Sequence, residues 1–536
     1  MMESSENQEK NAKPGIWDRI LEIPADSPRW ASLTYWLVLG LVVLRGLSHW
    51  LMPLDLAGDE AYYWEWGQHL DWGYFSKPPG IGWLMGGLSW LGVDSTFGIR
   101  MTSTLLGTIG LAFMYRLGRD LYDRRVGFIT VLISAMTIGN LALTALLTID
   151  APLLMFWVVA LAAFWNCVER GFRSLGWSIL LILALAGGLL SKQTMLMFYP
   201  MSGLYLLLSA ERRRLLWRPG YWIVVWVSWL ALVPPLWWNR RNDWITFAHT
   251  AHHFEAAPPT VLARLQRLGE LVGTQIGLLG PIMGLLLFAL VFAGILKWWR
   301  WARSSQFLYA FGAPGILMVL VMTWRQEINP NWPAVFYPSL TVLLAAWALG
   351  DSSLLPMLQR LRAWVWPGVK LNVGLVIACY LVLGLLSFGV VSAINWDPSA
   401  RLRGWTRLAD DVQKIRNSTT EPGRELLITV GHRYVTSELA FYLPDRPRVY
   451  PFHAHYRQIV SQHHFWPDPG EHLGKDALII VQRNRDKFPP ELKACFRSVT
   501  EMESLHYEGL SRRHRDYDIF LGEELLSWPE PDLEAP

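Results

Sequence analysis

The chain has 536 residues, of which 52% are hydrophobic and 17% charged, and its formal net charge is +4. A soluble protein carries about a quarter charged residues, so this composition excludes an ordinary soluble protein. It indicates a polytopic membrane protein with a soluble part attached. No Lys/Arg block with interleaved aromatic residues indicates nucleic-acid binding. The three cysteines, Cys167, Cys379 and Cys495, lie far apart in sequence, which favours neither a disulfide framework nor a metal site.

Long apolar segments follow one another along the chain. The first begins near Trp30, is too long for a signal-peptide core and lacks an A-x-A cleavage site, so we expect a retained helix. Because a helix needs about 20 apolar residues to cross the hydrocarbon core, the sequence predicts about eleven to thirteen transmembrane helices. The segments expected to span are 31–51, 98–118, 126–147, 152–168, 176–191, 194–210, 221–238, 271–296, 307–324, 333–350 and 372–394. The segment 81–92 is short and rich in glycine, so we expect it to be interfacial or re-entrant.

The distribution of Lys and Arg predicts the orientation, since these residues concentrate in cytoplasmic connections. One alternate set of connections carries most of them: Arg116, Arg119, Arg124, Arg125, Arg170, Arg173, Arg212, Arg213, Arg214, Arg218, Lys297, Arg300, Arg303, Arg360, Arg362 and Lys370. We therefore expect a cytoplasmic N-terminal segment at 1–30, a membrane domain at 31–394 and a soluble domain at 395–536 on the outer side. Within that last region, "ELLITVG" (425–431) and "DALIIVQ" (476–482) predict strands, and "YVTSELAFYL" (434–443) predicts an amphipathic helix. The soluble domain is thus expected to be a small α/β domain.

One outer connection, "GDEAYYWEWGQHLDWGYFSKPPG" (58–80), combines carboxylates, a cation and aromatic rings. It holds the acidic pair Asp59 and Glu60, and Lys77 stands before two prolines, which favour an extended, rigid loop. Asp150 and Lys192 stand at the outer ends of later spans. Charges so close to hydrocarbon are costly and usually functional, although snorkelling into water is the alternative.

These groups suit a substitution at a carbon that bears a phosphate leaving group. One carboxylate can take the proton of an attacking hydroxyl, and nearby cations can neutralise charge on the departing phosphate. Aromatic side chains in the same connection, among them Tyr62 and Tyr63, suit the apolar faces of a sugar.

Two further outer segments add polar groups. "WWNRRNDWITFAHTAHHFE" (237–255) contains Arg240, Arg241, Asp243, His249, His252, His253 and Glu255. It reads as an interfacial amphipathic helix or as a metal site, for which the histidine spacing alone is weak support. "WRQEINPNWP" (324–333) places Glu327 and Asn331 between two spans.

The segments "GDEAYYWEW…GYFSKPPGIGWL", "TIDAPLLMFW", "SKQTML", "NDWITF" and "EINPNWPA", in this order, resemble bacterial glycosyltransferases of the family 39/83 type with the GT-C fold. These enzymes are related to protein O-mannosyltransferases and to lipid A aminoarabinose and galacturonic acid transferases. The resemblance covers nearly the whole membrane part, and "RYVTSELAFYLPDRPRVY" is similar to one bacterial branch. It implies a mainly α-helical inner-membrane enzyme whose active site and α/β domain face the periplasm. Such an enzyme moves a sugar, with inversion, from a polyprenyl-phosphate donor to an envelope lipid such as lipid A, a glycan or a protein.

Roles for individual residues follow from the same resemblance. It implies catalytic roles for Asp59, for its neighbour Glu60 and for Asp150 at the fourth span. It implies contacts with the donor phosphate for Lys77, Lys192 and Arg241. The residues expected to bind substrate are Tyr62, Tyr63, His252, His253, Glu327 and Asn331. No cofactor is specified, and metal dependence is open, since two or three carboxylates could hold a divalent cation through water.

The soluble domain lacks a convergent set of carboxylates with a fixed cation, so we expect it to help acceptor access rather than chemistry. Its histidines at 453, 455, 463 and 464 are expected to be solvated. The rival functions are a secondary transporter and an envelope scaffold. A transporter should bind its substrate near the bilayer midplane on broken helices, often in inverted repeats, whereas the ionisable residues here stand at span ends. A scaffold leaves those charged ends unexplained.

Overall fold

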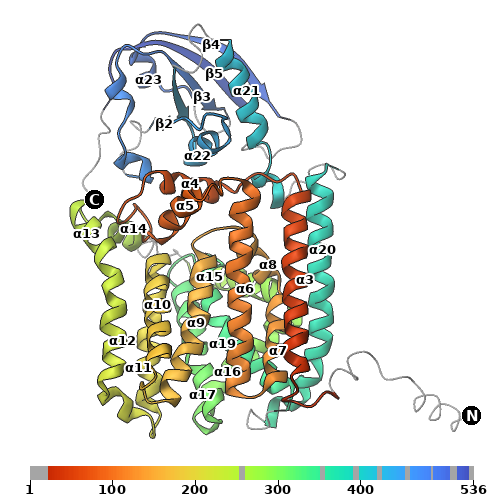
Figure 1. The fold of residues 1–536 in the computed structure, drawn as a ribbon. Coiled ribbons are helices and arrows are strands. Elements are labelled where there is room, and N and C mark those ends of the chain that lie inside the picture. Colours follow the sequence, from red (N-terminus) through yellow and green to blue (C-terminus); the bar gives the residue numbers. More distant parts are fainter. Residues whose placement is uncertain are drawn as a thin grey trace, which may run out of the picture.

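The computed structural model describes residues 22–252, 260–350, 356–389, 398–418, 425–452, 459–483, 487–507 and 516–529. It consists of a block of helices running side by side and a sheet domain that sits on one end of that block (Figure 1). We call the helices from α3 to α20 the membrane block and the described residues from 398 onward the C-terminal domain.

The membrane block is built in chain order from helices that mostly run along one axis (Figure 1). Its α-helices are α3 (Arg29–Leu51), α4 (Gly58–Gln68), α5 (Gly80–Trp90), α6 (Thr96–Leu121), α7 (Arg124–Ala135), α8 (Ile138–Ala145), α9 (Asp150–Glu169), α10 (Leu175–Ser191), α11 (Phe198–Leu208), α12 (Pro219–Trp229), α13 (Val233–Arg241), α14 (Ile245–His252), α15 (Val261–Leu279), α16 (Pro281–Ile295), α17 (Arg303–Ala310), α18 (Ala313–Thr323), α19 (Tyr337–Ala348) and α20 (Val365–Ser387). Several begin at side-chain caps: Ser95 accepts the Gly98 amide at α6, and Asp123 accepts the Val126 amide at α7.

Six helices in the described part of the chain are long and apolar enough to cross a membrane, or up to eight if each of two bent pairs counts as one span. Two shorter apolar helices, Leu175–Ser191 and Trp332–Ala348, accompany them. Each of the eleven segments expected from the sequence coincides wholly or largely with helix. The structure therefore confirms a mainly α-helical, multi-pass architecture.

Two expected spans are not continuous: within 126–147, α7 and α8 meet at a bend of 74°, and the segment 271–296 is also broken. The segment 271–296 was predicted as a single helix, but α15 and α16 meet at a bend of 117°. Gly280 lies at the break with a φ of +91°, and a Cβ there would lie 1.7 Å from Oδ1 of Asn372. Because only glycine tolerates this backbone conformation and this close approach, an apolar run that reads as one helix folds into two.

Burial separates the helices into a centre and a rim. α9 is apolar all round, and 89% of its most hydrophobic window is buried against other helices. The corresponding shares are 17% for α3 and 22% for the span ending in α20. A helix that is hydrophobic on every side must be enclosed by protein or by lipid, so α9 forms the core of the block while α3 and α20 present their apolar sides outward.

The short apolar segment near residues 81–92 forms α5, which is not among the helices long enough to span. Together with α4 it lies across the end of the membrane block, beneath the C-terminal domain (Figure 1). The two helices touch closely, since a Cβ on Gly67 would lie 2.5 Å from the Gly86 amide nitrogen. Of the two expectations for this segment, the interfacial one matches the structure.

The C-terminal domain is a five-stranded mixed sheet with the order β2-β1-β3-β5-β4. Its elements are α21 (Trp405–Asn417), β1 (Leu426–Val430), α22 (Arg433–Tyr442), β2 (Val449–Pro451), β3 (Ala477–Gln482), α23 (Pro490–Ala494), β4 (Phe496–His506) and β5 (Asp516–Leu525). β1 pairs in parallel with β2 and β3, and β5 pairs antiparallel with β3 and β4. The two strands and the helix predicted from the sequence are confirmed as β1, β3 and α22.

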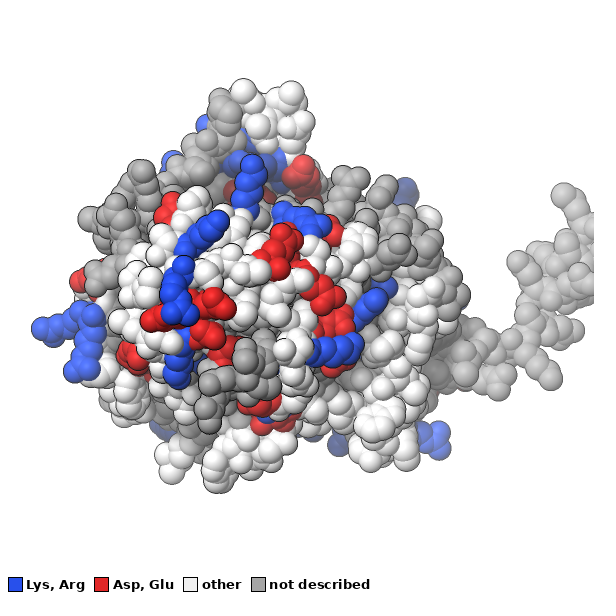
Figure 2. Space-filling model, turned by 90° about the horizontal axis from the view of Figure 1, so that it is seen from above, with Lys and Arg blue, Asp and Glu red and all other residues white. Residues whose placement is uncertain are grey.

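The two parts share a hydrophobic contact along α4 and α22. Trp64 of α4 meets Phe441 of α22 edge to face, with ring centroids 5.0 Å apart, and both belong to one buried cluster that also includes Tyr62, Val435 and Leu439. Seen from the side of the C-terminal domain, the molecule carries Lys, Arg, Asp and Glu interspersed over its face (Figure 2). This charged face contrasts with the apolar rim of the block and suits an aqueous surface.

Candidate active site

Asp59 lies in the first turn of α4, so the acidic pair sits on a helix rather than in a loop. The Glu60 carboxylate reaches back to accept the amide hydrogen of Ala57 at 3.0 Å, which satisfies one of the unpaired donors at the helix start. The sequence did not predict this helix, because its aromatic and acidic residues form no apolar stripe at helical spacing. The Asp59 side chain is 45% exposed.

Lys77 is held in a tight loop between α4 and α5. Its backbone exchanges two hydrogen bonds with Tyr74, at 3.2 and 3.4 Å, and the Tyr74 ring stacks on Trp66 with centroids 4.3 Å apart. Burial, and next the charge of Lys192, lowers the Lys77 pKa to about 8, against the opposing effects of nearby Asp150 and Asp59. Within the described part of the chain its ammonium makes no hydrogen bond or ion pair.

Asp150 and Lys192 form a buried ion pair. Lys192 Nζ lies 2.7 Å from Oδ1 of Asp150, and both side chains are less than one tenth exposed. The other carboxylate oxygen, Oδ2, accepts the Asn331 amide at 2.6 Å. The structure thus joins three residues predicted from the sequence into one cluster. Asp150 begins α9, Lys192 directly follows α10, and Asn331 lies between α18 and α19.

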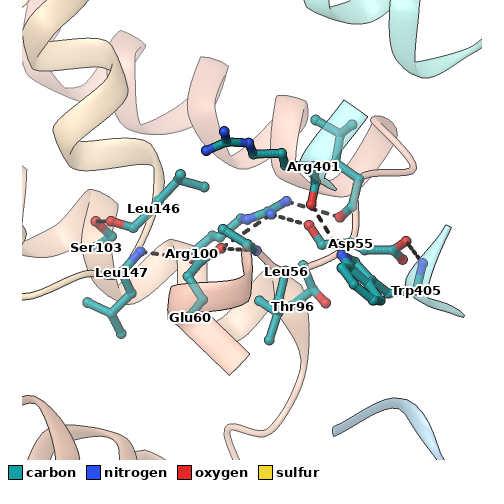
Figure 3. Close-up of polar contacts among 12 residues, drawn as sticks. Asp55, Leu56, Glu60, Thr96, Arg100, Ser103, Leu146, Leu147, Arg401 and Trp405 are labelled. Atoms are coloured by element: carbon teal, nitrogen blue, oxygen red, sulfur yellow. Dashed lines mark hydrogen bonds and ion pairs between the residues drawn. The ribbon is translucent and has the colours of Figure 1, made fainter. Parts of the chain in front are cut away.

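Glu60 lies in a separate buried network of polar contacts (Figure 3). Its side chain is fully buried, accepts the Leu147 amide at 2.9 Å and pairs with Arg100 at 3.4 Å. Arg100 also donates to the Leu54 carbonyl at 3.0 Å and to the Asp55 carbonyl. Because Leu147 lies just before α9, Glu60 links the helix that carries Asp59 to the segment that leads to Asp150.

Two residues that the sequence analysis did not single out reach Asp59 from the C-terminal domain. The Tyr434 hydroxyl donates to Oδ1 of Asp59 at 3.1 Å, and Arg433 lies 3.8 Å from the same oxygen. Tyr434 begins the helix predicted at 434–443 and Arg433 directly precedes it, but a contact between residues 375 positions apart leaves no spacing pattern. Nothing in the sequence indicated that this domain places a cation, Arg433, beside a carboxylate of α4.

The two tyrosines predicted to bind substrate, Tyr62 and Tyr63, are buried residues of α4. Tyr62 is buried, its hydroxyl accepts the Gln462 amide at 2.6 Å, and Arg433 lies over its ring at 5.0 Å. Tyr63 lies near Asp59 and Asp150. Its burial, and next these two negative charges, raise its pKa well above the usual value. Both phenols are therefore neutral hydrogen-bonding groups.

The remaining predicted residues are not brought into the cluster. Arg241 is exposed at the end of α13 and stacks on Trp237, 3.6 Å from the ring centroid. Glu327 is exposed and has no contact with the cluster among the described residues. His252 ends α14, and neither its side chain nor His253 belongs to the described part of the chain.

The expected solvation of the C-terminal histidines is wrong for His463. This side chain is buried and pairs with Glu65 of α4 at 2.9 Å. Positions 453 and 455 lie outside the described residues. Among the described residues, no group of three or more His, Cys, Asp or Glu side chains could hold a metal ion.

A cavity of about 280 Å³ opens in the membrane block next to Asn331. Its walls come from α7, α8, α15 and the start of α19, and most of the lining surface is apolar: Ala142, Leu143, Leu154, Leu278, Leu279, Pro330, Ala334 and Pro338 take part. The breaks between α7 and α8 and between α15 and α16 create the space. An apolar cavity thus ends at the residue that holds Asp150.

The convergent charges leave a net positive site. The charges of Lys192, Asp150, Asp59 and Arg433 all act on Lys77, so these groups lie near it. Three cations face two carboxylates there, so the balance is one positive charge. Such a site can bind a monoanionic phosphodiester and stabilise the additional charge that develops as the phosphate leaves.

Comparisons with known proteins show what the chain is similar to. A family described as dolichyl-phosphate-mannose-protein mannosyltransferase matches residues 76–238, a stretch that contains Lys77, Asp150 and Lys192. The lipid A galacturonosyltransferase RgtD of Rhizobium johnstonii is 26% identical over 421 residues, which cover 76% of this chain and 83% of that protein.

Solved structures show the same fold. ArnT from Cupriavidus metallidurans in the apo state superposes with a TM-score of 0.58 at 16% identity, over 93% of this chain and all of ArnT. ArnT bound to undecaprenyl phosphate gives the same TM-score at 17% identity, over 94% of this chain and all of ArnT. These likenesses confirm the resemblance read from the sequence: the chain is a multi-pass membrane glycosyltransferase with the GT-C fold.

Proposed function

We propose that the protein transfers a sugar, with inversion, from a polyprenyl-phosphate donor to an envelope lipid acceptor of the lipid A type. The likeness to a lipid A galacturonosyltransferase supports the acceptor class, and the likeness to a protein that binds undecaprenyl phosphate supports the donor class. The observation that carries the proposal is Lys77. Its ammonium is enclosed, has no partner among the described residues and lies beside two carboxylates, which suits an anionic ligand.

Asp59 acts as the general base. It is the half-exposed carboxylate of the cluster, so an acceptor hydroxyl can approach it. Its carboxylate takes the hydroxyl proton while the hydroxyl oxygen bonds to the anomeric carbon of the sugar. The bond from that carbon to the phosphate oxygen breaks, and its electron pair leaves with the polyprenyl phosphate. Attack from the side opposite the phosphate inverts the anomeric carbon.

Lys77 and Lys192 stabilise the departing phosphate. Lys77 supplies a charge that no protein group among the described residues neutralises by direct contact. Lys192 is already paired with Asp150 at 2.7 Å, so it contributes a fixed, partly balanced charge. Asp150 and Asn331 then hold Lys192 in place, and we assign them positioning roles. Glu60, buried and saturated with hydrogen bonds, positions α4 and does not touch substrate.

The cavity beside Asn331 takes the first isoprene units of the donor lipid. Its walls are largely apolar and it lies within the membrane block, whereas the charged cluster lies at the ends of the helices. A polyprenyl phosphate has this same division between an apolar tail and a charged head. The position of the cluster at helix ends also distinguishes the enzyme from a transporter, whose site would lie near the midplane.

We place the cluster and the C-terminal domain on the periplasmic side, because the cation-rich connections lie at the opposite ends of the helices. The test is labelling with a membrane-impermeant thiol reagent after the three native cysteines are replaced by alanine. Leu473→Cys, on the C-terminal domain, should react in intact spheroplasts. Arg214→Cys, in a cation-rich connection, should react only after permeabilisation. The reverse pattern would overturn the orientation.

The activity is tested by mass spectrometry of envelope lipids from cells with and without the protein, followed by transfer with the purified enzyme. The proposal expects one sugar-bearing lipid to disappear with the protein. It also expects purified enzyme in detergent to restore that product from a polyprenyl-phosphate sugar. Loss of a modified protein or glycan, with unchanged lipids, would replace the acceptor class. Transfer from a nucleotide sugar alone would overturn the donor class.

A further inference from the structure

The Asp59 carboxylate is held asymmetrically. Both of its contacts in the described part of the chain fall on Oδ1: the Tyr434 hydroxyl at 3.1 Å and Arg433 at 3.8 Å. Burial, and next the charge of Asp59, raise the Tyr434 pKa, so this hydroxyl keeps its proton and is the donor. Oδ2 is left without a protein partner among these residues.

The two contacting side chains are themselves fixed. The Tyr434 ring packs against the backbone of Gly58, where a Cβ would lie 2.3 Å from the ring. Arg433 lies over the Tyr62 ring at 5.0 Å and over the Tyr434 ring at 5.1 Å. Arginine on an aromatic face gains from a cation–π contact. The start of α22 therefore lies in close contact with Gly58, the residue before Asp59.

A second contact, one turn further along α22, also fixes the position of α22 on α4. Ser437 of α22 donates to Glu65 of α4 at 2.6 Å, and His463 pairs with the same carboxylate oxygen at 2.9 Å. All three side chains are buried. The C-terminal domain thus contacts α4 through a fixed polar anchor, which sets the position of Arg433 and Tyr434 relative to Asp59.

We propose that Arg433 and Tyr434 are positioning residues for the transfer, which hold Oδ1 of Asp59 so that Oδ2 accepts the proton of the acceptor hydroxyl. The inference rests on the proposed base role of Asp59. A half-exposed aspartate otherwise rotates among rotamers, and a base must lie within hydrogen-bond reach of the proton that it removes. Contacts on one oxygen orient the other without occupying it. The membrane block alone, without the docked C-terminal domain, has no oriented base.

The test is a double-mutant cycle between Asp59 and each positioning residue, read as the single-turnover rate of sugar transfer by the full-length enzyme in detergent. Tyr434→Phe keeps the ring against Gly58 and removes the hydroxyl, and Arg433→Gln removes the charge. Each should slow transfer by about 3- to 30-fold in the wild-type background, and Tyr434→Phe should leave donor affinity within about twofold. In the Asp59→Asn background neither should slow transfer further, because both act through the carboxylate.

Tyr442→Phe is the matched control, since Tyr442 lies on the same helix and its hydroxyl accepts the Leu56 amide at 2.7 Å without contacting Asp59. Any loss it causes should persist in the Asp59→Asn background. Equal losses from Tyr434→Phe in both backgrounds would mean a structural role and would overturn the inference, as would no loss from either substitution. A near-normal rate for Asp59→Asn itself would instead remove the base role on which the inference rests.

Discussion

Asp59 and Glu60 are neighbours in sequence, yet they lie in opposite surroundings. Glu60 is fully buried and saturated by two backbone amides and Arg100. Asp59 is 45% exposed, and among the described residues only its Oδ1 has protein contacts. Burial of an unpaired carboxylate is costly, and the contacts on both oxygens of Glu60 offset that cost. We infer from the comparison that the saturated acid Glu60 builds this site, and we propose that Asp59 is left for a reacting group.

The two lysines repeat the same contrast. Lys192 is buried in an ion pair with Asp150, whereas Lys77 has no partner among the described residues. If the comparison holds, substitutions at the saturated residues should change stability, and substitutions at the unsaturated residues should change transfer.

The largest effect on stability is expected from Glu60→Ala. It leaves Arg100 buried without its carboxylate, which typically costs about 3 to 5 kcal/mol. Asp59→Ala should cost less than about 1 kcal/mol, because its side chain is half exposed. Thermal unfolding of the two variants in the same detergent measures the difference. Equal unfolding temperatures would break the comparison between the two acids.

Lys77→Met should weaken both donor binding and transfer while leaving the unfolding temperature nearly unchanged. Removing one preorganised charge from a developing anion typically costs about 10²- to 10³-fold in rate. Lys77→Arg is not expected to rescue the rate fully, since a planar guanidinium has a different reach from an ammonium held by this loop. Single-turnover transfer and separate donor binding are the measurements. A variant with normal rate and affinity would remove Lys77 from the site.

Two histidines of the C-terminal domain, the buried His463 and the exposed His506, allow the same comparison outside the charged cluster. His463→Gln breaks a buried pair with Glu65 and should lower the free energy of unfolding by about 1 to 3 kcal/mol. His506→Gln breaks an ion pair with Asp516. Because the His506 side chain is 56% exposed, the free energy of unfolding should fall by less than about 1 kcal/mol. Chemical unfolding of the full chain in detergent compares them. A larger loss for His506→Gln would contradict the anchoring role of His463.

Donor binding should depend on pH through Lys77. Its pKa is about 8 because burial and Lys192 disfavour the charged form. Lysine is charged below its pKa, so affinity for a phosphate should be full near pH 6.5 and fall as pH rises through 8. If only the charged form binds, the dissociation constant at pH 9 is about tenfold weaker. Lys77→Arg should flatten this dependence between pH 7 and 9, and an unchanged profile would assign it to another group.

The helical architecture could be predicted from the sequence, and the five motif segments could be identified in it, because both leave local signals. Apolar runs of about 20 residues mark spans, and ionisable residues at their ends mark a site. The bend at Gly280 could not be predicted, because it depends on the approach of Asn372 from a distant helix. The burial of Glu60 depends in the same way on Arg100 and Leu147.

The contribution of the C-terminal domain was missed for the same physical reason. Arg433 and Tyr434 begin an ordinary amphipathic helix, and their meaning comes from the docking of that helix on α4. β4 and β5 also escaped prediction, since most β4 side chains are exposed and the strand lacks a β-branched apolar run. Local patterns thus indicated Asp59 and Lys77, to which we assign direct roles, whereas tertiary contacts bring Arg433 and Tyr434 to Asp59.

The central claim is that Asp59 is the base of a lipid-phosphate-dependent transfer, and single-turnover transfer by Asp59→Asn tests it most directly. Asparagine keeps nearly the same shape but does not accept the proton, so the rate should fall by about 10² to 10⁴. Donor affinity and the unfolding temperature should stay close to wild type, because the phosphate and lipid contacts lie elsewhere. A rate within a few-fold of wild type would contradict the account and make Asp150 the next candidate.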